Sequence, residues 1–371
     1  MNKIMFLMYS LEGGGAQKNL VDTVNHLNKE KYEITIQTLF HSEDLLGLLC
    51  SDVHYTSAFC IRSKILKKLI SGFIQYVLPP SLVYRWLFQG DYDVEVAFME
   101  AFPTKILAYS SNRKAKKYAW IHTDVTVNER QDRLYRSLEH QKACYEQFDG
   151  ICCVAEGVKK SFIKKFDIRK NVSVVYNILN EKIIEERGRQ PCTGYRKETF
   201  TIVSIGRLVS IKGYDRLIRL CGRLKKEGFA FHLLILGEGP LERELKSLIR
   251  ELDLMDFISL IGFQENPYPY LAQGDLYVCS SYAEGFSTAV SEAVILKIPV
   301  VTTECSGMQE ILGDSEYGLI TENDDEALYR GIRQMLSDES LYQHYCGKVK
   351  ERSSFFHMET RLRAYEDLLD R

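Results

Sequence analysis

Short apolar runs alternate with amphipathic segments along almost the whole chain, and this alternation limits the possible folds more than any other feature of the sequence. The apolar runs at 4–9, 94–99 and 150–155 have the length of buried strands, whereas the segment 17–28 has apolar residues at helical spacing. Continuous apolar strands that alternate with helices are typical of parallel sheets covered on both faces. The sequence therefore predicts an α/β fold with doubly wound sheets.

The same pattern occurs twice in the 371 residues, on either side of a polar stretch at 180–198. A chain of this length exceeds what one compact core usually serves. We therefore expect an N-terminal domain over 1–180 and a C-terminal domain over 181–354. The final segment, 355–371, predicts a helix that could belong to either domain and could cross back to the first.

Composition and charge exclude several classes of protein. No run approaches the roughly 20 apolar residues that a membrane-spanning helix needs. The start of the chain lacks a secretory signal, and ten scattered cysteines do not form a disulfide framework, so we expect a cytoplasmic protein. The net charge of −2 argues against nucleic-acid binding, but residues 1–180 hold 24 Lys and Arg against 19 Asp and Glu. This balance of +5, against −7 in the remainder, favours an anionic partner for the first domain.

Three loops that follow predicted strands could bind a ligand, because ligands of doubly wound sheets lie at the carboxyl ends of the strands. The first loop contains Gly13-Gly14-Gly15, whose backbone could approach an anion or simply form a tight turn. The second carries Arg207 and Lys212, which could grip phosphate oxygens or be ordinary surface charges. The third runs from Glu284 to Glu292 and could bind a ligand or merely begin a helix.

With these residues the chain resembles the family 4 retaining glycosyltransferases of the GT-B fold, which have two Rossmann-like domains facing a central cleft. The resemblance covers nearly the whole chain and is strongest over 200–320. Its motifs are Gly14-Gly15, Gly206-Arg207-Leu208 with Lys212-Gly213, Gly237-Glu238-Gly239-Pro240, and the E-x7-E signature from Glu284 to Glu292.

The resemblance implies roles for individual residues. Arg207 and Lys212 would bind the donor diphosphate, Glu284 the hydroxyls of the donor sugar, and Glu292 the ribose hydroxyls. Backbone amides of Gly285, Phe286 and Ser287 would contact sugar or phosphate, and Gly14 and Gly15 would approach the phosphate from the other domain. His122 would lie beside the reacting sugar, and Gln264 near the base. Glu284, His122, Arg207 and Lys212 would thus be the catalytic residues.

These roles imply a retaining transfer of a hexose or N-acetylhexosamine from a nucleotide sugar, with UDP as the default, to a saccharide acceptor. The cations could neutralise the leaving diphosphate without a metal or other cofactor. The D-x-D triplet Asp91-Tyr92-Asp93 precedes a predicted strand, so it favours a turn over a metal site. The process would be bacterial capsule, exopolysaccharide or lipid-linked glycan assembly.

Residues 61–78 form an amphipathic segment with a basic end, where Arg62, Lys64, Lys67 and Lys68 lie. Its apolar stripe comprises Ile65, Leu66, Leu69, Ile70, Phe73, Ile74, Val77 and Leu78. Such a helix suits an anionic membrane surface, although the same stripe could pack onto a core. We expect peripheral association with the membrane and a lipid-linked acceptor.

Two other functions remain open from the sequence. The chain could be another GT-B enzyme, such as a phosphorylase or a nucleotide-sugar epimerase. It could also be a non-catalytic subunit that binds a nucleotide sugar and stabilises a partner transferase. An assay of donor hydrolysis separates this subunit from an enzyme.

Overall fold

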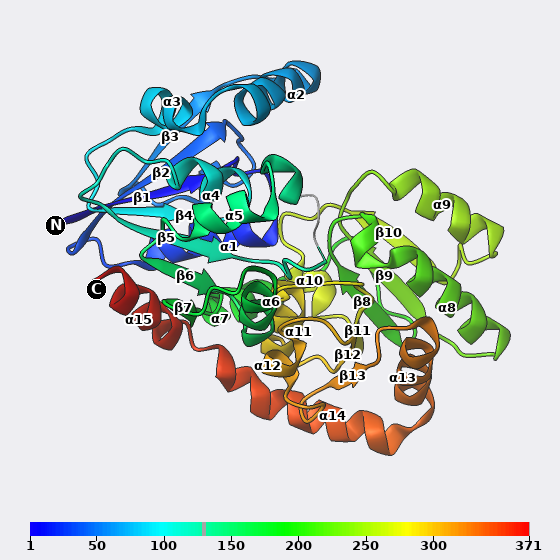
Figure 1. Ribbon diagram of the computed structural model, residues 1–371. Helices are drawn as coiled ribbons and strands as arrows, with labels where there is room; N and C mark the ends of the chain where they lie inside the picture. The colour runs from blue at the N-terminus through cyan, green and yellow to red at the C-terminus, as the bar shows by residue number, and fades with distance from the viewer. Residues whose placement is uncertain (128–130, 371) are drawn as a thin grey trace. The chain divides into compact units, whose positions relative to one another are not determined.

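The computed structural model describes residues 1–127 and 131–370 and divides the chain into two compact units. The first unit comprises Met1–Ile178 and Glu359–Arg371, and the second comprises Leu179–Met358. Each unit is built around one parallel sheet (Figure 1). The expected α/β architecture of two doubly wound domains is therefore confirmed.

The first unit contains a seven-stranded sheet in the order β3-β2-β1-β4-β5-β6-β7, with every pair parallel. Its strands are β1 (Asn2–Met8), β2 (Tyr32–Phe40), β3 (Val53–Phe59), β4 (Val94–Ala97), β5 (Lys116–Ile121), β6 (Gly150–Cys153) and β7 (Val172–Val174). Its helices are α1 (Gly15–His26), η1 (Leu46–Leu48), α2 (Lys64–Gly72), η2 (Phe73–Val77), α3 (Pro80–Val83), η3 (Tyr84–Phe88), α4 (Phe102–Leu107), η4 (Asp132–Leu134), α5 (Leu138–Tyr145), α6 (Glu156–Phe166) and α15 (Met358–Leu369).

The second unit contains a six-stranded sheet in the order β10-β9-β8-β11-β12-β13, again with every pair parallel. Its strands are β8 (Thr201–Ile205), β9 (His232–Leu236), β10 (Ile258–Gly262), β11 (Leu276–Cys279), β12 (Val300–Thr303) and β13 (Leu319–Thr321). Its helices are α7 (Glu181–Gly188), η5 (Ser210–Lys212), α8 (Tyr214–Lys226), α9 (Glu242–Glu251), α10 (Tyr268–Leu271), α11 (Thr288–Ile295), α12 (Met308–Leu312), α13 (Asp325–Ser337), α14 (Glu339–Arg352) and η6 (Ser353–Phe356).

Both sheets reverse the direction of their winding at one point, between β1 and β4 in the first unit and between β8 and β11 in the second. Loops that follow the two strands at such a point diverge to opposite faces of the sheet and leave a crevice at the carboxyl ends. The strands themselves are held by core side chains that are almost wholly buried, including Ile202 and Leu276, which lie opposite each other on β8 and β11. The topology thus brings the Arg207–Lys212 loop and the Glu284 loop to neighbouring strands.

The C-terminal helix α15 returns to the first unit. Its Tyr365 ring stacks on Trp120 of β5 at a centroid distance of 5.3 Å, and the Tyr118 hydroxyl donates to the Leu368 carbonyl at 3.0 Å. Lys31, beside β2, forms an ion pair with Asp370 at 2.6 Å. Of the segment 355–371 that we expected to be a helix, the part from Met358 to Leu369 is α15, and Arg371 lies outside the described residues.

The segment 61–78 differs from the single helix that its apolar spacing predicts. The α-helix α2 ends at Gly72 and continues as the wider π-helical turn η2. Ser71 and Ile74 face the unit's interior, whereas most of the predicted stripe is exposed. Core packing therefore does not explain the apolar stripe of this segment.

Candidate active site

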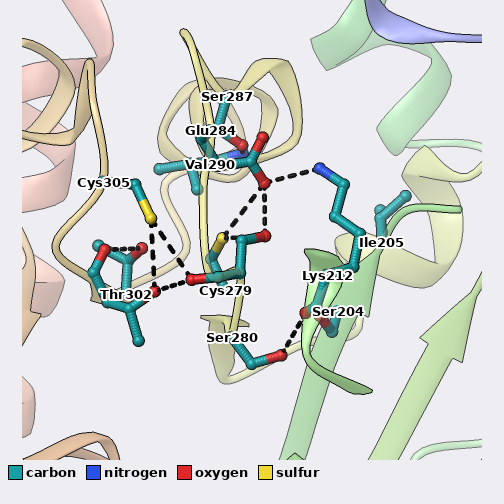
Figure 2. A network of polar contacts seen from close by, with 12 residues as sticks. Ser204, Ile205, Lys212, Cys279, Ser280, Glu284, Ser287, Val290, Thr302 and Cys305 are labelled. Carbon is teal, nitrogen blue, oxygen red and sulfur yellow. Dashed lines mark hydrogen bonds and ion pairs between the residues drawn. The ribbon is translucent and has the colours of Figure 1, made fainter. Parts of the chain in front are cut away.

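The loops after β8 and β11 bring together two of the charged residues that the sequence singles out. Lys212 ends the short helix η5, and its Nζ lies 2.6 Å from Oε1 of Glu284 (Figure 2). The Lys212 side chain is 26% exposed and that of Glu284 is 11% exposed. The two therefore form a largely shielded ion pair at the carboxyl ends of neighbouring strands.

A glycine allows the loop of Lys212 to pass this close to β11. Gly213 has a φ of +63°, and a Cβ on it would lie 2.2 Å from the carbonyl oxygen of Ser280. The Ser280 hydroxyl in turn donates to the Lys212 carbonyl at 2.9 Å. Because no other residue type fits without displacing backbone, the Lys-Gly pair of the motif has a structural cause.

The Glu284 carboxylate is also held by its own loop. The Ser281 hydroxyl donates to Oε1 of Glu284 at 2.5 Å, and the Cys279 thiol lies 3.9 Å from the same oxygen. Burial alone would lower the pKa of Lys212, but the nearby Glu284 carboxylate, together with Cys279 and Cys305, outweighs burial and raises the pKa above its ordinary value. Lys212 is thus fixed as a cation and Glu284 as its oriented partner.

The backbone beneath this pair is anchored by two side chains, which donate three hydrogen bonds to it. The guanidinium of Arg216, which is 1% exposed, donates to the carbonyls of Ser280 and Ser281 at 2.8 Å each. The Thr303 hydroxyl at the end of β12 donates to the Ser281 carbonyl at 2.6 Å. These contacts preorganise the loop that carries Glu284.

Arg207 lies on the same loop as Lys212 but is differently placed. Its side chain is exposed and makes no hydrogen bond or ion pair with any other residue that the structure describes. The loop is narrow here, because a Cβ on Gly237 would lie 2.1 Å from the Gly206 carbonyl oxygen and one on Gly239 would lie 2.5 Å from that of Leu208. The two glycines of the Gly237–Pro240 motif therefore allow close packing under Arg207, whose guanidinium is available to a ligand.

Helix α11 begins directly after the Glu284 loop. Ser287 caps it by accepting a hydrogen bond from the Val290 amide at 3.4 Å. A Cβ on Gly307 would lie 2.3 Å from the Gly285 carbonyl oxygen, so the turn through Gly285 and Phe286 packs tightly on the next loop. The amides at the N-terminus of a helix favour anions.

Glu292 and Gln264 each have a hydrogen-bond partner within the second unit. Glu292 is 4% exposed and accepts a hydrogen bond from the Tyr268 hydroxyl at 3.0 Å. The Gln264 amide donates to the Ile261 carbonyl at 3.3 Å, just after β10. A role for either in binding a nucleoside remains a prediction.

In the first unit, the glycine loop after β1 leads into α1, whose N-cap is Gly14 and whose first residue is Gly15. The Gly13 amide donates to the Asp44 carboxylate at 3.1 Å, and the Gly14 carbonyl accepts from the Lys18 amide at 2.9 Å. A backbone amide of this loop is thus already paired with a carboxylate.

His122, which follows β5, is buried at 8% exposure, and burial lowers its pKa to about 4. Its backbone amide and that of Thr123 donate to the Glu100 carboxylate. Asp93 of the D-x-D triplet accepts from the Lys3 amide at 2.8 Å. Among the residues that the structure describes, no three His, Cys, Asp or Glu side chains cluster in a way that could hold a metal ion.

Sequence reasoning missed Ser281 and Glu100. Glu100 directly follows the predicted strand 94–99, and Ser281 lies two residues after β11, so both are at the end where ligands bind, and this position was the available signal. Glu100 meets the amides after β5 because β4 and β5 are neighbours in the sheet. Ser281 meets Glu284 within the loop that follows β11.

Comparison with known proteins gives consistent results. Residues 191–352 match the family model of glycosyl transferases group 1. A Campylobacter jejuni protein named N-acetylgalactosamine-N,N'-diacetylbacillosaminyl-diphospho-undecaprenol 4-alpha-N-acetylgalactosaminyltransferase is 35% identical over 215 residues, which are 57% of each chain. The putative colanic acid biosynthesis glycosyltransferase WcaL of Escherichia coli is 37% identical over 136 residues, or 34% of each chain. The match thus spans little more than half the length of the first of these relatives.

Among solved structures, Anabaena HepE in complex with UDP-glucose superposes over the full length of both chains with a TM-score of 0.77 at 16% identity. TarM of Staphylococcus aureus does so with a TM-score of 0.77 at 14% identity. Identities this low show the fold alone. Together these findings support the resemblance seen in the motifs: the chain has the GT-B fold, and its residues 191–352 match the family model of glycosyl transferases group 1.

Proposed function

We propose that this protein is a retaining glycosyltransferase that moves a hexose or N-acetylhexosamine from a UDP-sugar to a lipid-linked saccharide. The observation that carries the proposal is the Lys212–Glu284 ion pair at the winding reversal of the second sheet, with the unpaired Arg207 on the same loop. This arrangement offers a fixed cation, an exposed second cation and an oriented carboxylate within the segment that matches the glycosyl transferases group 1.

The chemistry follows from where charge develops. When the bond between sugar and diphosphate breaks, negative charge grows on the leaving phosphate and positive charge on the sugar ring. Arg207 and Lys212, with the amides at the start of α11, would stabilise the phosphate charge without a metal ion. Glu284 would accept hydrogen bonds from hydroxyls of the sugar, and Glu292 from those of the ribose.

The surroundings of Glu284 support retention by front-face attack. A carboxylate that already receives Lys212 and the Ser281 hydroxyl is a poor nucleophile, so a covalent intermediate on Glu284 is disfavoured. The leaving phosphate would instead take the acceptor's proton. We further propose that Gly14 and Gly15 contact the donor phosphate, that His122 contacts the sugar, and that Gln264, Gly285, Phe286 and Ser287 complete donor binding.

The choice of donor and acceptor is supported by the relatives. HepE was solved with UDP-glucose, and the C. jejuni protein is named for an α-linkage to a diphospho-undecaprenol saccharide. WcaL is named for colanic acid, an exopolysaccharide. Capsule or exopolysaccharide assembly at the cytoplasmic face of the membrane is the process that suits this chain best.

The donor half of the proposal is tested by a thermal-shift panel of nucleotide sugars, followed by an assay of donor hydrolysis and transfer. A UDP-sugar should raise the melting temperature, because it binds the folded protein. Arg207→Ala should abolish the shift for that sugar, whereas Arg219→Ala, which removes another exposed arginine from the same unit, should keep it. If the protein binds a nucleotide sugar but neither hydrolyses nor transfers it, the non-catalytic subunit is the better description.

The first unit presents an exposed apolar patch that supports the membrane half of the proposal. The patch is formed by side chains of α2 and η2, namely Ile65, Leu66, Leu69, Phe73, Tyr76 and Val77, whose exposed fractions range from 46% to 75%, and Trp86 of η3 is also exposed. Lys64 and Lys68 lie on the same helix and are exposed, whereas Lys67 forms an ion pair with Glu12 at 3.3 Å. Exposed apolar side chains flanked by lysines suit an anionic lipid surface. None of the helices in the described residues is long and apolar enough to span a membrane.

Flotation with vesicles that contain anionic lipid tests this surface. The wild type should float with the vesicles, and both Lys64/Lys68→Glu and Leu69/Phe73→Ser should remain at the bottom of the gradient. Lys164/Lys170→Glu makes the same charge change at exposed positions near α6 and β7 and should still float. Flotation that depends equally on both lysine pairs would indicate attraction by overall charge and contradict a specific patch.

A further inference from the structure

Glu100 lies just after β4 and is 2% exposed, yet the proposed chemistry gives it no role. Its Oε1 accepts hydrogen bonds from the backbone amides of His122 at 2.6 Å and Thr123 at 2.7 Å, and from the Thr123 hydroxyl at 3.1 Å. Three donors from two consecutive residues thus converge on one carboxylate oxygen. The carboxylate bridges the carboxyl ends of two neighbouring strands, β4 and β5.

This contact fixes the direction of the His122 side chain. Two consecutive amides that point at one atom restrain the backbone torsions between them, and these torsions set the direction of the Cα–Cβ bond. The imidazole itself packs on the Phe98 ring, with centroids 5.1 Å apart and planes inclined by 54°. Residues after β4 therefore hold both the backbone and the ring of His122.

A contact that served only to hold the two loops together would not need a buried carboxylate, because burying a charged group lowers the stability of the fold. Burial raises the pKa of Glu100 despite the hydrogen bonds that oppose this shift, and its Oε2 is buried without a partner among the described residues. The Nε2 of His122 is buried and unpartnered in the same part of the structure. Buried polar atoms that lack a hydrogen-bond partner are uncommon, and groups with shifted pKa values are often found at functional sites.

We propose that Glu100 is a positioning residue that holds His122 in the orientation needed for sugar transfer. The claim about transfer rests on the proposed function, whereas the claim about orientation does not. The alternative is that Glu100 only ties the two loops together, with no effect on turnover beyond that of stability.

A double-mutant cycle separates the two. Glu100→Ala should lower kcat by about tenfold to a hundredfold while the KM for the donor changes less than about threefold, because misplaced groups act on the reacting geometry. Glu100→Gln keeps an acceptor for both amides and should recover most of the loss. In a His122→Ala background, Glu100→Ala should cost less than about a further twofold. An equal cost in both backgrounds would overturn the proposal.

Glu95→Gln is the matched control. Glu95 lies on β4 itself, is fully buried, and accepts from the Tyr84 hydroxyl at 2.5 Å rather than from the His122 loop. It should change kcat by less than about twofold. If Glu100→Ala does not fold, Glu100→Asp replaces it, because the shorter carboxylate cannot reach both amides.

Nuclear magnetic resonance of the full chain without donor tests the orientation independently of activity. Glu100→Ala should shift the His122 ring signals and let the imidazole pKa rise from about 4 towards 6.5, since a loosened loop is better solvated. Glu100→Gln should leave the signals near those of the wild type. If the His122 ring signals are the same in Glu100→Ala as in the wild type, the positioning role is overturned. If Glu100→Ala shifts the His122 signals but the wild-type protein turns over no nucleotide sugar, the positioning of His122 stands and only the proposed function is overturned.

Discussion

Neutralising the Lys212–Glu284 pair should reveal how much of its energy serves folding and how much serves the reaction. Removing one partner of a fully buried pair costs about 3–5 kcal/mol, and exposed pairs contribute about 0–1 kcal/mol. With side chains 26% and 11% exposed, this pair lies between these limits. Lys212→Met should therefore cost about 1–3 kcal/mol of unfolding free energy, since the Glu284 carboxylate keeps the Ser281 hydroxyl as a donor.

Glu284→Gln should cost less than about 1 kcal/mol, because the amide oxygen can still accept from Lys212 and Ser281. Combined in a cycle, the two changes should show a coupling of about 1–2 kcal/mol in urea unfolding. Both variants should lose about a hundredfold or more in kcat/KM for transfer, since each removes charge from the reacting site.

The exposed pair Lys246–Glu242 on α9 is the control. Its atoms are 2.5 Å apart, but its side chains are 55% and 42% exposed. Lys246→Met and Glu242→Gln should couple by no more than about 0.5 kcal/mol and leave transfer unchanged. Additive effects of Lys212→Met and Glu284→Gln on stability would show that the pair is not formed in solution, and normal turnover in both would refute its role in the reaction.

Three further predictions concern the scaffold. Gly213→Ala should destabilise the protein by about 2–4 kcal/mol in urea unfolding, whereas Gly228→Ala, with a positive φ but open space around it, should cost about 1 kcal/mol. Burial holds the pKa of His122 in the folded protein at about 4, below its ordinary 6.5, so the unfolded chain binds more protons between these two pH values. The stability that this group contributes is therefore full above pH 6.5 and is lost as the pH falls towards 4. His122→Gln should remove this part of the pH dependence of the unfolding free energy. Tyr365→Ala should cost about 3–5 kcal/mol, since it empties a buried site stacked on Trp120, and a loss below 1 kcal/mol in thermal or urea unfolding would contradict the packing of α15.

Much of the fold could be predicted because it depends on local patterns. Apolar runs at strand length and the helical spacing between them give the two doubly wound sheets, and the polar stretch from 180 lies where the structure divides the chain, at Ile178 and Leu179. Lys212 and Gly213 could be singled out because their motif follows a strand directly, and the structure supplies the reason for the glycine.

Other features depend on distant partners that periodicity does not reveal. Glu100 meets His122 because β4 and β5 are neighbours, which is a property of the sheet order. The stripe over 61–78 has the same spacing whether it faces a core, water or lipid, so its exposure could not be predicted. The apolar spacing likewise does not reveal that the helix continues as the π-helical turn η2.

The return of α15 has a consequence for biosynthesis. The second unit is an insertion between Ile178 and Glu359, so the ribosome makes some 180 residues before the last piece of the first unit emerges. At about 5–20 residues per second, this interval lasts on the order of 10–40 seconds. During that time the Trp120 ring, which is fully buried in the finished protein, lacks its stacking partner Tyr365. A nascent first unit would therefore be a natural client for a chaperone that covers apolar surface.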